Sequence, residues 1–245
     1  MHRDPFAKQW RAGLLLLLLT AAVLNGCAPK EEPFSARHRI VFFGDSITEL
    51  GVKPNGYVTL IRDSLKSIGA DASVTGAGIS GNKIGDLLAR AERDVLPHRP
   101  TVVVIYIGIN DVWHYAFASR GLSGTPKQEF DAGLRTLVTS LQSAGARTVL
   151  CTPTVIGERK NGANTYDAML EEYSAVTRSV AAATGSALCD LRQTFTSYLA
   201  LNNPDDAAKD ILTYDGVHLN DAGNRLTAVT MMQTLDGMGL FFPQR

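Results

Sequence analysis

The 245-residue sequence lacks an excess of charge of either sign, because 24 Lys and Arg residues balance 24 Asp and Glu residues. A nucleic-acid-binding protein usually carries a surplus of basic residues, so that class is excluded. The 22 glycines and 10 prolines follow no period, which excludes a collagen-like chain. With 45% hydrophobic residues the chain can bury a core, and its length predicts one folded domain.

Cysteine is also scarce, with only Cys27, Cys151 and Cys189 in the whole sequence. No cluster of Cys and His residues has the spacing of metal ligands, so we expect no metal site. Cys151 and Cys189 could pair as a disulfide or remain as two buried thiols, and the sequence leaves both alternatives open.

Long hydrophobic runs are absent as well, since the apolar stretch at residues 12–24 has only 13 residues. A membrane-spanning helix needs about 20. Three basic residues stand within the first eleven positions, and this pattern predicts an export signal. Residues 24–27 read LNGC and resemble the lipobox of bacterial lipoproteins, which implies acylation of Cys27. An ordinary secretory signal with an incidental cysteine is the alternative.

The predicted organisation has three parts: an export signal at 1–26, a polar tether at 27–37 and a folded domain at 38–245. We therefore expect an exported protein of the bacterial cell envelope, either lipid-anchored or periplasmic. Its contact with a membrane would then be made only through the lipid on Cys27.

Beyond the tether, short apolar segments alternate with segments whose apolar residues recur at helical spacing. The predicted strands are 40–43, 72–75, 102–107, 148–151 and 187–189. The predicted helices are 57–68, 84–95, 130–141, 169–180 and 221–235. Residues 102–107 are all apolar and mostly β-branched, which is typical of a strand buried on both faces of a parallel sheet.

This alternation predicts an α/β fold in which helices cover both faces of a five-stranded parallel sheet, a three-layer αβα sandwich. We expect the flavodoxin-like strand order 2-1-3-4-5, which is common for doubly wound sheets of this size.

Polar and glycine-rich loops follow the first three predicted strands: GDSIT at 44–48, GAGISG at 76–81 and GIND at 108–111. In the order 2-1-3 these loops are neighbours at the carboxyl edge of the sheet, where ligands bind in such folds. Just before the last helix, Asp215 precedes His218 by three residues, so one turn can aim both side chains the same way. A hydroxyl, a histidine oriented by a carboxylate and nearby N–H donors predict the site of a nucleophilic hydrolase.

Two other interpretations of these motifs fail on spacing. The glycines at 76, 78 and 81 match a dinucleotide fingerprint, but the first acid after the next strand, Asp111, lies about 30 residues on instead of about 20. The α/β-hydrolase fold is excluded because the sequence contains no G-x-S-x-G and because Asp215 and His218 are so close together.

The four motifs, in this order, resemble those of the SGNH, or GDSL-type, hydrolases over residues 38–240. The resemblance implies that Ser46 is the nucleophile, and that His218 and Asp215 complete the catalytic triad. It also implies an oxyanion hole formed by the N–H of Ser46, the N–H of Gly78 and the side-chain amide of Asn110.

The expected reaction is hydrolysis of a carboxylic ester through an acyl-enzyme on Ser46, with no metal or organic cofactor. We expect Asp45, Trp113 and Tyr115 to contact the substrate, which we predict to be a short-chain ester or an O-acetylated carbohydrate. A lysophospholipase or thioesterase of the same fold is one alternative. A non-catalytic binding lipoprotein of the envelope is the other.

Overall fold

The computed structural model describes residues 37–241. The predicted export signal and Cys27 lie outside the described residues, so export and lipid attachment stay predictions. No helix between residues 37 and 241 is long and apolar enough to cross a membrane.

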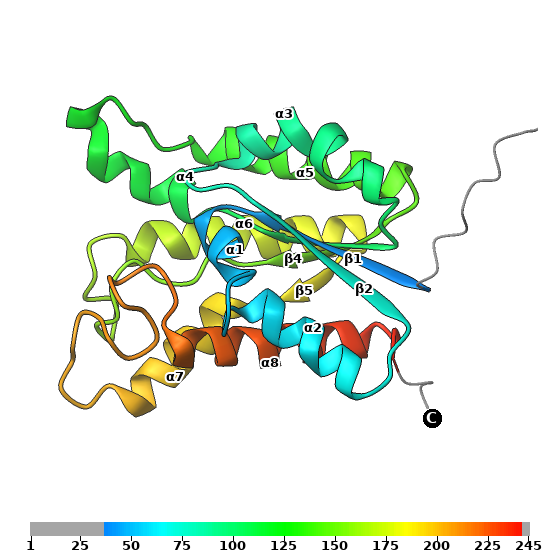
Figure 1. The fold of residues 1–245 in the computed structure, drawn as a ribbon. Coiled ribbons are helices and arrows are strands. Elements are labelled where there is room, and N and C mark those ends of the chain that lie inside the picture. The colour runs from blue at the N-terminus through cyan, green and yellow to red at the C-terminus, as the bar shows by residue number, and fades with distance from the viewer. Residues whose placement is uncertain (1–36, 242–245) are drawn as a thin grey trace, which may run out of the picture. The chain divides into compact units, whose positions relative to one another are not determined.

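Five parallel strands form a single sheet in the order β2-β1-β3-β4-β5, which confirms the predicted order (Figure 1). The strands are β1 (His38–Gly44), β2 (Ala72–Gly78), β3 (Val102–Tyr106), β4 (Arg147–Cys151) and β5 (Ala187–Cys189). Side chains of Ile40–Phe43 in β1 and of Val102–Tyr106 in β3 are at most 2% exposed. The central strands are therefore buried on both faces, as their unbroken apolar sequences predict.

Helices cover both faces of the sheet, so the predicted αβα sandwich is confirmed (Figure 1). One layer contains α3 (Ile84–Asp94), α5 (Lys127–Ser143) and α6 (Asp167–Thr184), which pack side by side. The other contains α2 (Tyr57–Ser67), α7 (Leu191–Asn202) and α8 (Asp221–Gly237). The short helices α1 (Ser46–Gly51) and α4 (Ile109–Trp113) begin just after β1 and β3. Two 3₁₀ helices, η1 (Leu96–His98) and η2 (His114–Arg120), complete the described elements.

Helix α7 was not among the helices predicted from the sequence, although its signal is present. Leu191, Phe195 and Leu199 are buried at a spacing of four residues, which puts them on one face of the helix. The side chain of Asp190 caps the helix by accepting a hydrogen bond from the N–H of Gln193.

Cys151 and Cys189 lie opposite each other at the ends of β4 and β5. Both are free and buried, so of the two alternatives the structure has the pair of thiols.

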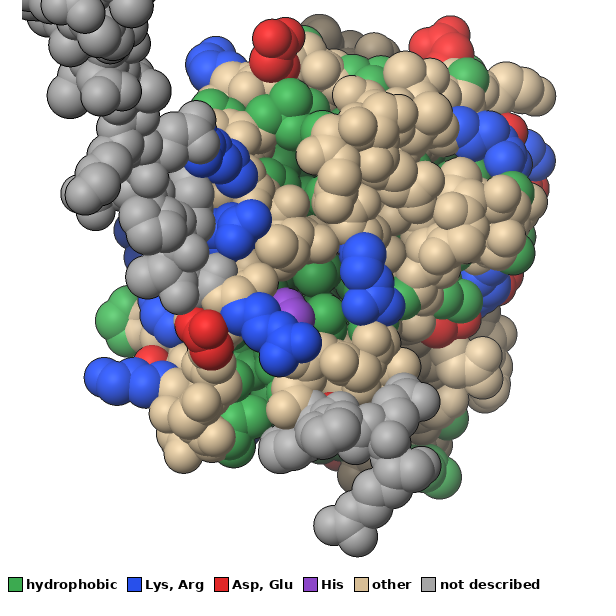
Figure 2. Space-filling model, turned by 90° about the vertical axis from the view of Figure 1, so that its right-hand side faces the viewer, with side chains coloured by type: hydrophobic (Ala, Val, Ile, Leu, Met, Phe, Trp, Pro, Cys, Tyr) green, Lys and Arg blue, Asp and Glu red, His purple; other side chains and the backbone are tan. Residues whose placement is uncertain are grey.

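The predicted site motifs all lie at one end of the sheet. Figure 2 shows the opposite end, at which the strands begin, where Lys, Arg, Asp and Glu side chains are spread among uncharged ones. The glycine-rich and polar motifs follow the strands and therefore lie at the other end, on the left of Figure 1.

Candidate active site

Ser46, His218 and Asp215 form a continuous chain of hydrogen bonds at the carboxyl edge of the sheet. Oγ of Ser46 lies 2.9 Å from Nε2 of His218, and Nδ1 of His218 lies 2.7 Å from Oδ2 of Asp215. Ser46 and His218 are 172 positions apart, so only the tertiary fold brings them together. In this geometry the carboxylate holds the Nδ1 proton and leaves Nε2 free to accept the proton of the serine hydroxyl.

Ser46 is the first residue of α1 and follows β1 with one residue between them. Gly44 ends the strand, and a Cβ atom there would lie 2.3 Å from the carbonyl oxygen of Tyr106 on β3. Only glycine permits this close approach of the two strands. Oδ1 of Asp45 accepts the N–H of Ile47 at 2.9 Å, which fixes the first turn of the helix.

Asp215 and His218 are held in one tight turn. Oδ1 of Asp215 accepts the N–H groups of Val217 and His218, at 2.9 and 2.7 Å. Gly216 has a φ of +95°, a conformation that favours glycine. The N–H of Tyr214 donates to the carbonyl of His218 at 3.0 Å and closes the turn. The carboxylate therefore has one oxygen committed to the backbone and the other to the imidazole.

The pKa of Asp215 reflects two opposing effects. Burial raises it, but hydrogen bonds from the imidazole and N–H of His218 and from the N–H of Val217 outweigh burial. The pKa of Asp215 is thus held below its usual value, and the residue stays ionised at neutral pH.

The predicted oxyanion-hole residues lie at or just after the ends of the neighbouring strands β1, β2 and β3: Ser46 in α1, Gly78 in β2 and Asn110 in α4. Gly78 ends β2 opposite Gly44, and a Cβ atom there would lie 2.2 Å from the backbone nitrogen of Glu49. Asn110 is 3% exposed, and its Nδ2 donates to the carbonyl of Asn82 at 3.1 Å. An amide nitrogen carries two hydrogens, so this bond fixes the side chain and leaves one hydrogen for a ligand.

Asp45 is buried, at 2% exposure, and its side chain caps α1. Its expected contact with the substrate stays a prediction. Burial raises the pKa of Asp45 to about 7, and the nearby carboxyl of Asp111 adds to this rise. The folded state therefore keeps a proton on Asp45 that the unfolded chain releases above about pH 4.

Asp45→Asn should accordingly weaken the pH dependence of stability. In the wild type the contribution of Asp45 to the free energy of unfolding falls as the pH rises from about 4 to about 7, because Asp45 binds a proton more tightly when folded. Asparagine caps a helix equally well and carries no charge, so the variant should lose about 1–2 kcal/mol less between pH 5 and 7. Urea unfolding of both proteins at pH 5 and pH 7 measures this difference. An equal decline of the free energy of unfolding in the two proteins would show that folded Asp45 does not hold the proton.

Of the aromatic residues predicted to bind substrate, Trp113 lies beside the triad and Tyr115 packs elsewhere. The ring of Trp113 meets the imidazole of His218 edge-on, with centroids 6.2 Å apart. Tyr115 packs instead over Gly124, where a Cβ atom would lie 2.2 Å from its ring. Tyr214, which the sequence analysis did not select, stacks on His218 with centroids 5.7 Å apart and is 49% exposed.

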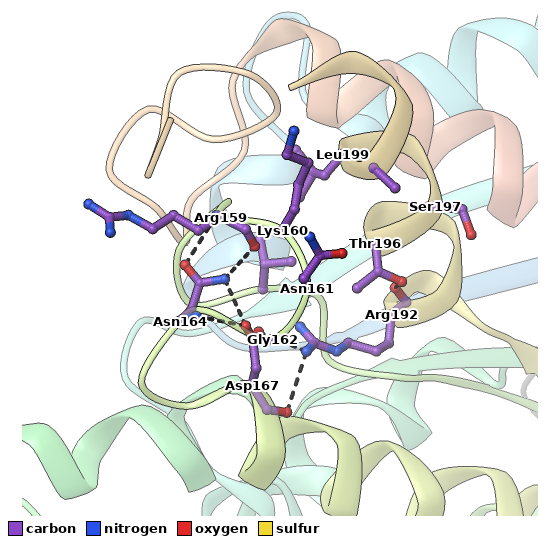
Figure 3. A pocket seen from close by; sticks show the side chains of 12 residues that line it. Arg159, Lys160, Asn161, Gly162, Asn164, Asp167, Arg192, Thr196, Ser197 and Leu199 are labelled. Carbon is purple, nitrogen blue, oxygen red and sulfur yellow. Dashed lines mark hydrogen bonds and ion pairs between the residues drawn. The ribbon is translucent and has the colours of Figure 1, made fainter. Parts of the chain in front are cut away.

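A separate cavity of about 330 Å³ lies between α7 and the loop that joins β4 to α6 (Figure 3). Its lining includes Asn161, Arg192 and Ser197 and none of the predicted site residues. The loop nevertheless contacts the turn that carries Asp215 and His218, because Gly157 donates its N–H to the carbonyl of Gly216 at 2.8 Å. Within residues 37–241, no group of His, Cys, Asp and Glu side chains could hold a metal ion.

Comparison with known families agrees with this geometry. Residues 42–226 match the model of the GDSL-like lipase/acylhydrolase family. The matched range includes the whole Ser46, Asp215 and His218 constellation.

Individual relatives are similar over most of the chain. An acetylxylan esterase of Geobacillus stearothermophilus is 31% identical over 211 residues, which cover 80% of this chain and 93% of that protein. The isoamyl acetate-hydrolyzing esterase 1 homolog of Mus musculus is 26% identical over 231 residues, 81% of each chain. The crystal structure of the acetyl xylan esterase AlAXEase superposes with a TM-score of 0.77 and 43% identity, covering 80% of this chain and 99% of that one.

Proposed function

We propose that this chain, which belongs to the GDSL-like lipase/acylhydrolase family and is a carboxylic ester hydrolase, removes acetyl groups from xylan-type carbohydrate through an acyl-enzyme on Ser46. The observation that carries the proposal is the hydrogen-bonded chain from Ser46 through His218 to Asp215.

In the proposed mechanism, Nε2 of His218 takes the proton of Ser46 as Oγ attacks the acetyl carbonyl carbon. The N–H groups of Ser46 and Gly78 and the amide of Asn110 stabilise the oxyanion of the tetrahedral intermediate. The bond to the sugar oxygen then breaks, and that oxygen takes the proton from His218. Water attacks the acetyl-serine in the same way, acetate leaves and Ser46 regains its proton.

Two observations favour an acetylated carbohydrate. Relatives at 31% and 43% identity are named as acetylxylan esterases. In addition, Trp113 and the half-exposed Tyr214 flank His218 with their rings. Flat apolar rings beside a nucleophile suit the face of a sugar ring, whose hydroxyls remain in water.

A substrate series tests the proposal. We expect the purified protein to hydrolyse p-nitrophenyl acetate faster than the butyrate, and the octanoate slowest of all. It should also release acetate from acetylated xylo-oligosaccharides, and Ser46→Ala should abolish both activities. A rate that rises with acyl-chain length would overturn the proposed substrate and favour a lysophospholipase or thioesterase. Hydrolysis of short esters without acetate release from the oligosaccharides would overturn only the carbohydrate assignment.

A further inference from the structure

Glu158 carries a carboxylate that is completely buried in the loop between β4 and α6. Its Oε2 accepts the N–H of Ile211 at 2.7 Å. Its Oε1 accepts the N–H of Leu212 at 2.8 Å, and both the N–H and the hydroxyl of Thr213, at 2.6 and 2.7 Å. All four donors are uncharged, and they belong to three consecutive residues just before Asp215.

Such an arrangement constrains the backbone strongly. A carboxylate removed from water is costly unless hydrogen bonds replace those it loses. Here residues 211–213 supply the replacement, so any other conformation of this segment leaves a buried charge without its donors. Hydrogen bonds to a charged acceptor are also about twice as strong as those between neutral groups.

The constraint reaches the triad through Gly216, the residue that follows Asp215. The hydroxyl of Thr213, which donates to Glu158, accepts the N–H of Gly216 at 3.1 Å. The carbonyl of Gly216 accepts the N–H of Gly157 at 2.8 Å. The N–H of Gly216 is therefore held by Thr213, a hydrogen-bond partner of Glu158, and its carbonyl by Gly157, the residue before Glu158.

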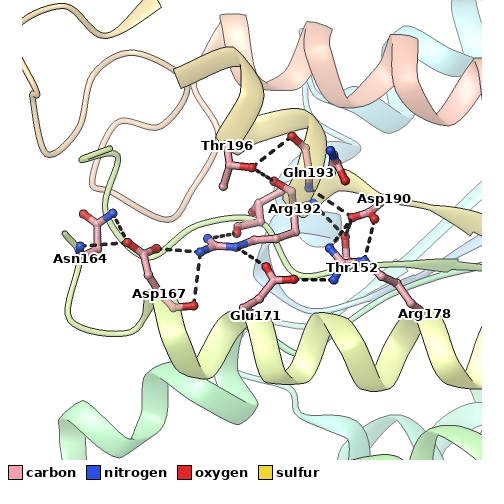
Figure 4. Close-up of polar contacts among 10 residues, drawn as sticks. Thr152, Asn164, Asp167, Glu171, Arg178, Asp190, Arg192, Gln193 and Thr196 are labelled. Atoms are coloured by element: carbon pink, nitrogen blue, oxygen red, sulfur yellow. Dashed lines mark hydrogen bonds and ion pairs between the residues drawn. The ribbon is translucent and has the colours of Figure 1, made fainter. Parts of the chain in front are cut away.

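This segment is itself anchored to the body of the domain. The side chain of Asn164 bonds to both the N–H and the carbonyl of Arg159, and also to the carboxylate of Asp167 (Figure 3). Asp167 in turn accepts Nη2 of the buried Arg192 on α7 at 2.8 Å (Figure 4). Hydrogen bonds therefore connect this loop to α6 and, through Asp167, to α7.

We propose that Glu158 is a positioning residue for the Ser-His-Asp triad. It fixes residues 211–213, and through Thr213 and Gly216 it sets the position of Asp215 relative to His218. This role rests on the proposed function, because it assumes that these residues work as a catalytic triad.

Glu158→Gln tests the proposal, since the amide keeps the shape of the side chain but turns one acceptor into a donor that faces backbone N–H groups. We expect kcat on p-nitrophenyl acetate to fall about 10²-fold with KM within about twofold, because a small displacement of a reacting group costs that much. The downfield proton NMR signal of an imidazole Nδ1–H bound to a carboxylate should disappear in the variant. A residue that only stabilised the fold would leave that signal unchanged.

Asp190→Asn is the matched control. Asp190 also lies in a connection at the strand ends, and it binds Arg178 and the N-terminal turn of α7. Its loss should lower Tm while leaving kcat and the Nδ1–H signal of the folded protein as in the wild type. Equal losses of kcat in Glu158→Gln and Asp190→Asn would overturn the proposal.

Thr213→Val provides a second test if Glu158→Gln does not fold. It removes one donor to Glu158 and the acceptor of the Gly216 N–H, and we expect kcat to fall about tenfold. An unchanged kcat and Nδ1–H signal in this variant would overturn the positioning role.

If the wild type hydrolysed no ester in a Ser46-dependent manner, the proposed function would fail. Loss of the Nδ1–H signal in either variant would still support the positioning of His218.

Discussion

Replacing Ser46 with alanine should lower kcat on acetate esters by about 10⁴- to 10⁶-fold, because alanine has no hydroxyl that could form the acyl-enzyme. Tm should change by less than about 3 °C, since the hydroxyl makes one side-chain hydrogen bond, to His218, and contributes about 1 kcal/mol. Initial-rate kinetics and thermal unfolding of the two proteins measure both effects.

The residual rate of Ser46→Ala also measures how much the rest of the site accelerates hydrolysis without the nucleophile. The proposed oxyanion donors, Gly78 and Asn110, are intact in this variant, so a rate above that of water would come from them and from substrate binding. A kcat of Ser46→Ala close to the wild-type value would show that Ser46 is not the nucleophile.

Asp215→Asn should lower kcat by about 10⁴-fold, and the structure shows why an isosteric change has so large an effect. Oδ1 of Asp215 accepts two backbone N–H groups, so the asparagine must keep its oxygen there. Its NH₂ group then faces Nδ1 of His218 and can only donate to it. The imidazole proton moves to Nε2, and His218 can no longer accept the proton of Ser46.

This tautomer argument predicts a chemical signature as well as a rate. Reaction of Ser46 with a sulfonyl fluoride should slow in parallel with kcat, because both need Nε2 as a base. Asp221→Asn is the control: Asp221 is an exposed acid three residues after His218, and its loss should leave both rates as in the wild type. Asp215→Asn with rates within tenfold of the wild type would be incompatible with an orienting role for Asp215.

The described part of the fold follows closely from local sequence patterns. All five predicted strands and all five predicted helices are present, because an apolar period of 2.0 or 3.6, or an unbroken apolar run, indicates which residues a segment buries. The strand order follows from connection rules that apply to any such alternation. The position of Ser46 could be predicted because it follows a strand whose end lies at the carboxyl edge of the sheet. The turn with Asp215 and His218 follows no strand, and its place beside Ser46 was implied by the family resemblance of the motifs.

Contacts between distant loops could not be predicted in this way. Glu158 bonds to residues 53 to 55 positions further on, and the polar sequence around it is what a solvent-exposed loop would also have. Tyr214 stacks on His218 although Tyr115, in the more conspicuous aromatic segment, packs over Gly124.

The sequence by itself therefore determined the layered α/β fold and the identity of the three residues that form the hydrogen-bonded chain. Only the tertiary structure decided which groups surround and hold them: the buried carboxyl of Asp45, the ring of Tyr214 and the support from Glu158. The physical reason is that periodicity and motif spacing indicate which residues of a segment are buried in the core. The partners of a loop side chain depend on which other loops the sheet brings to the same edge.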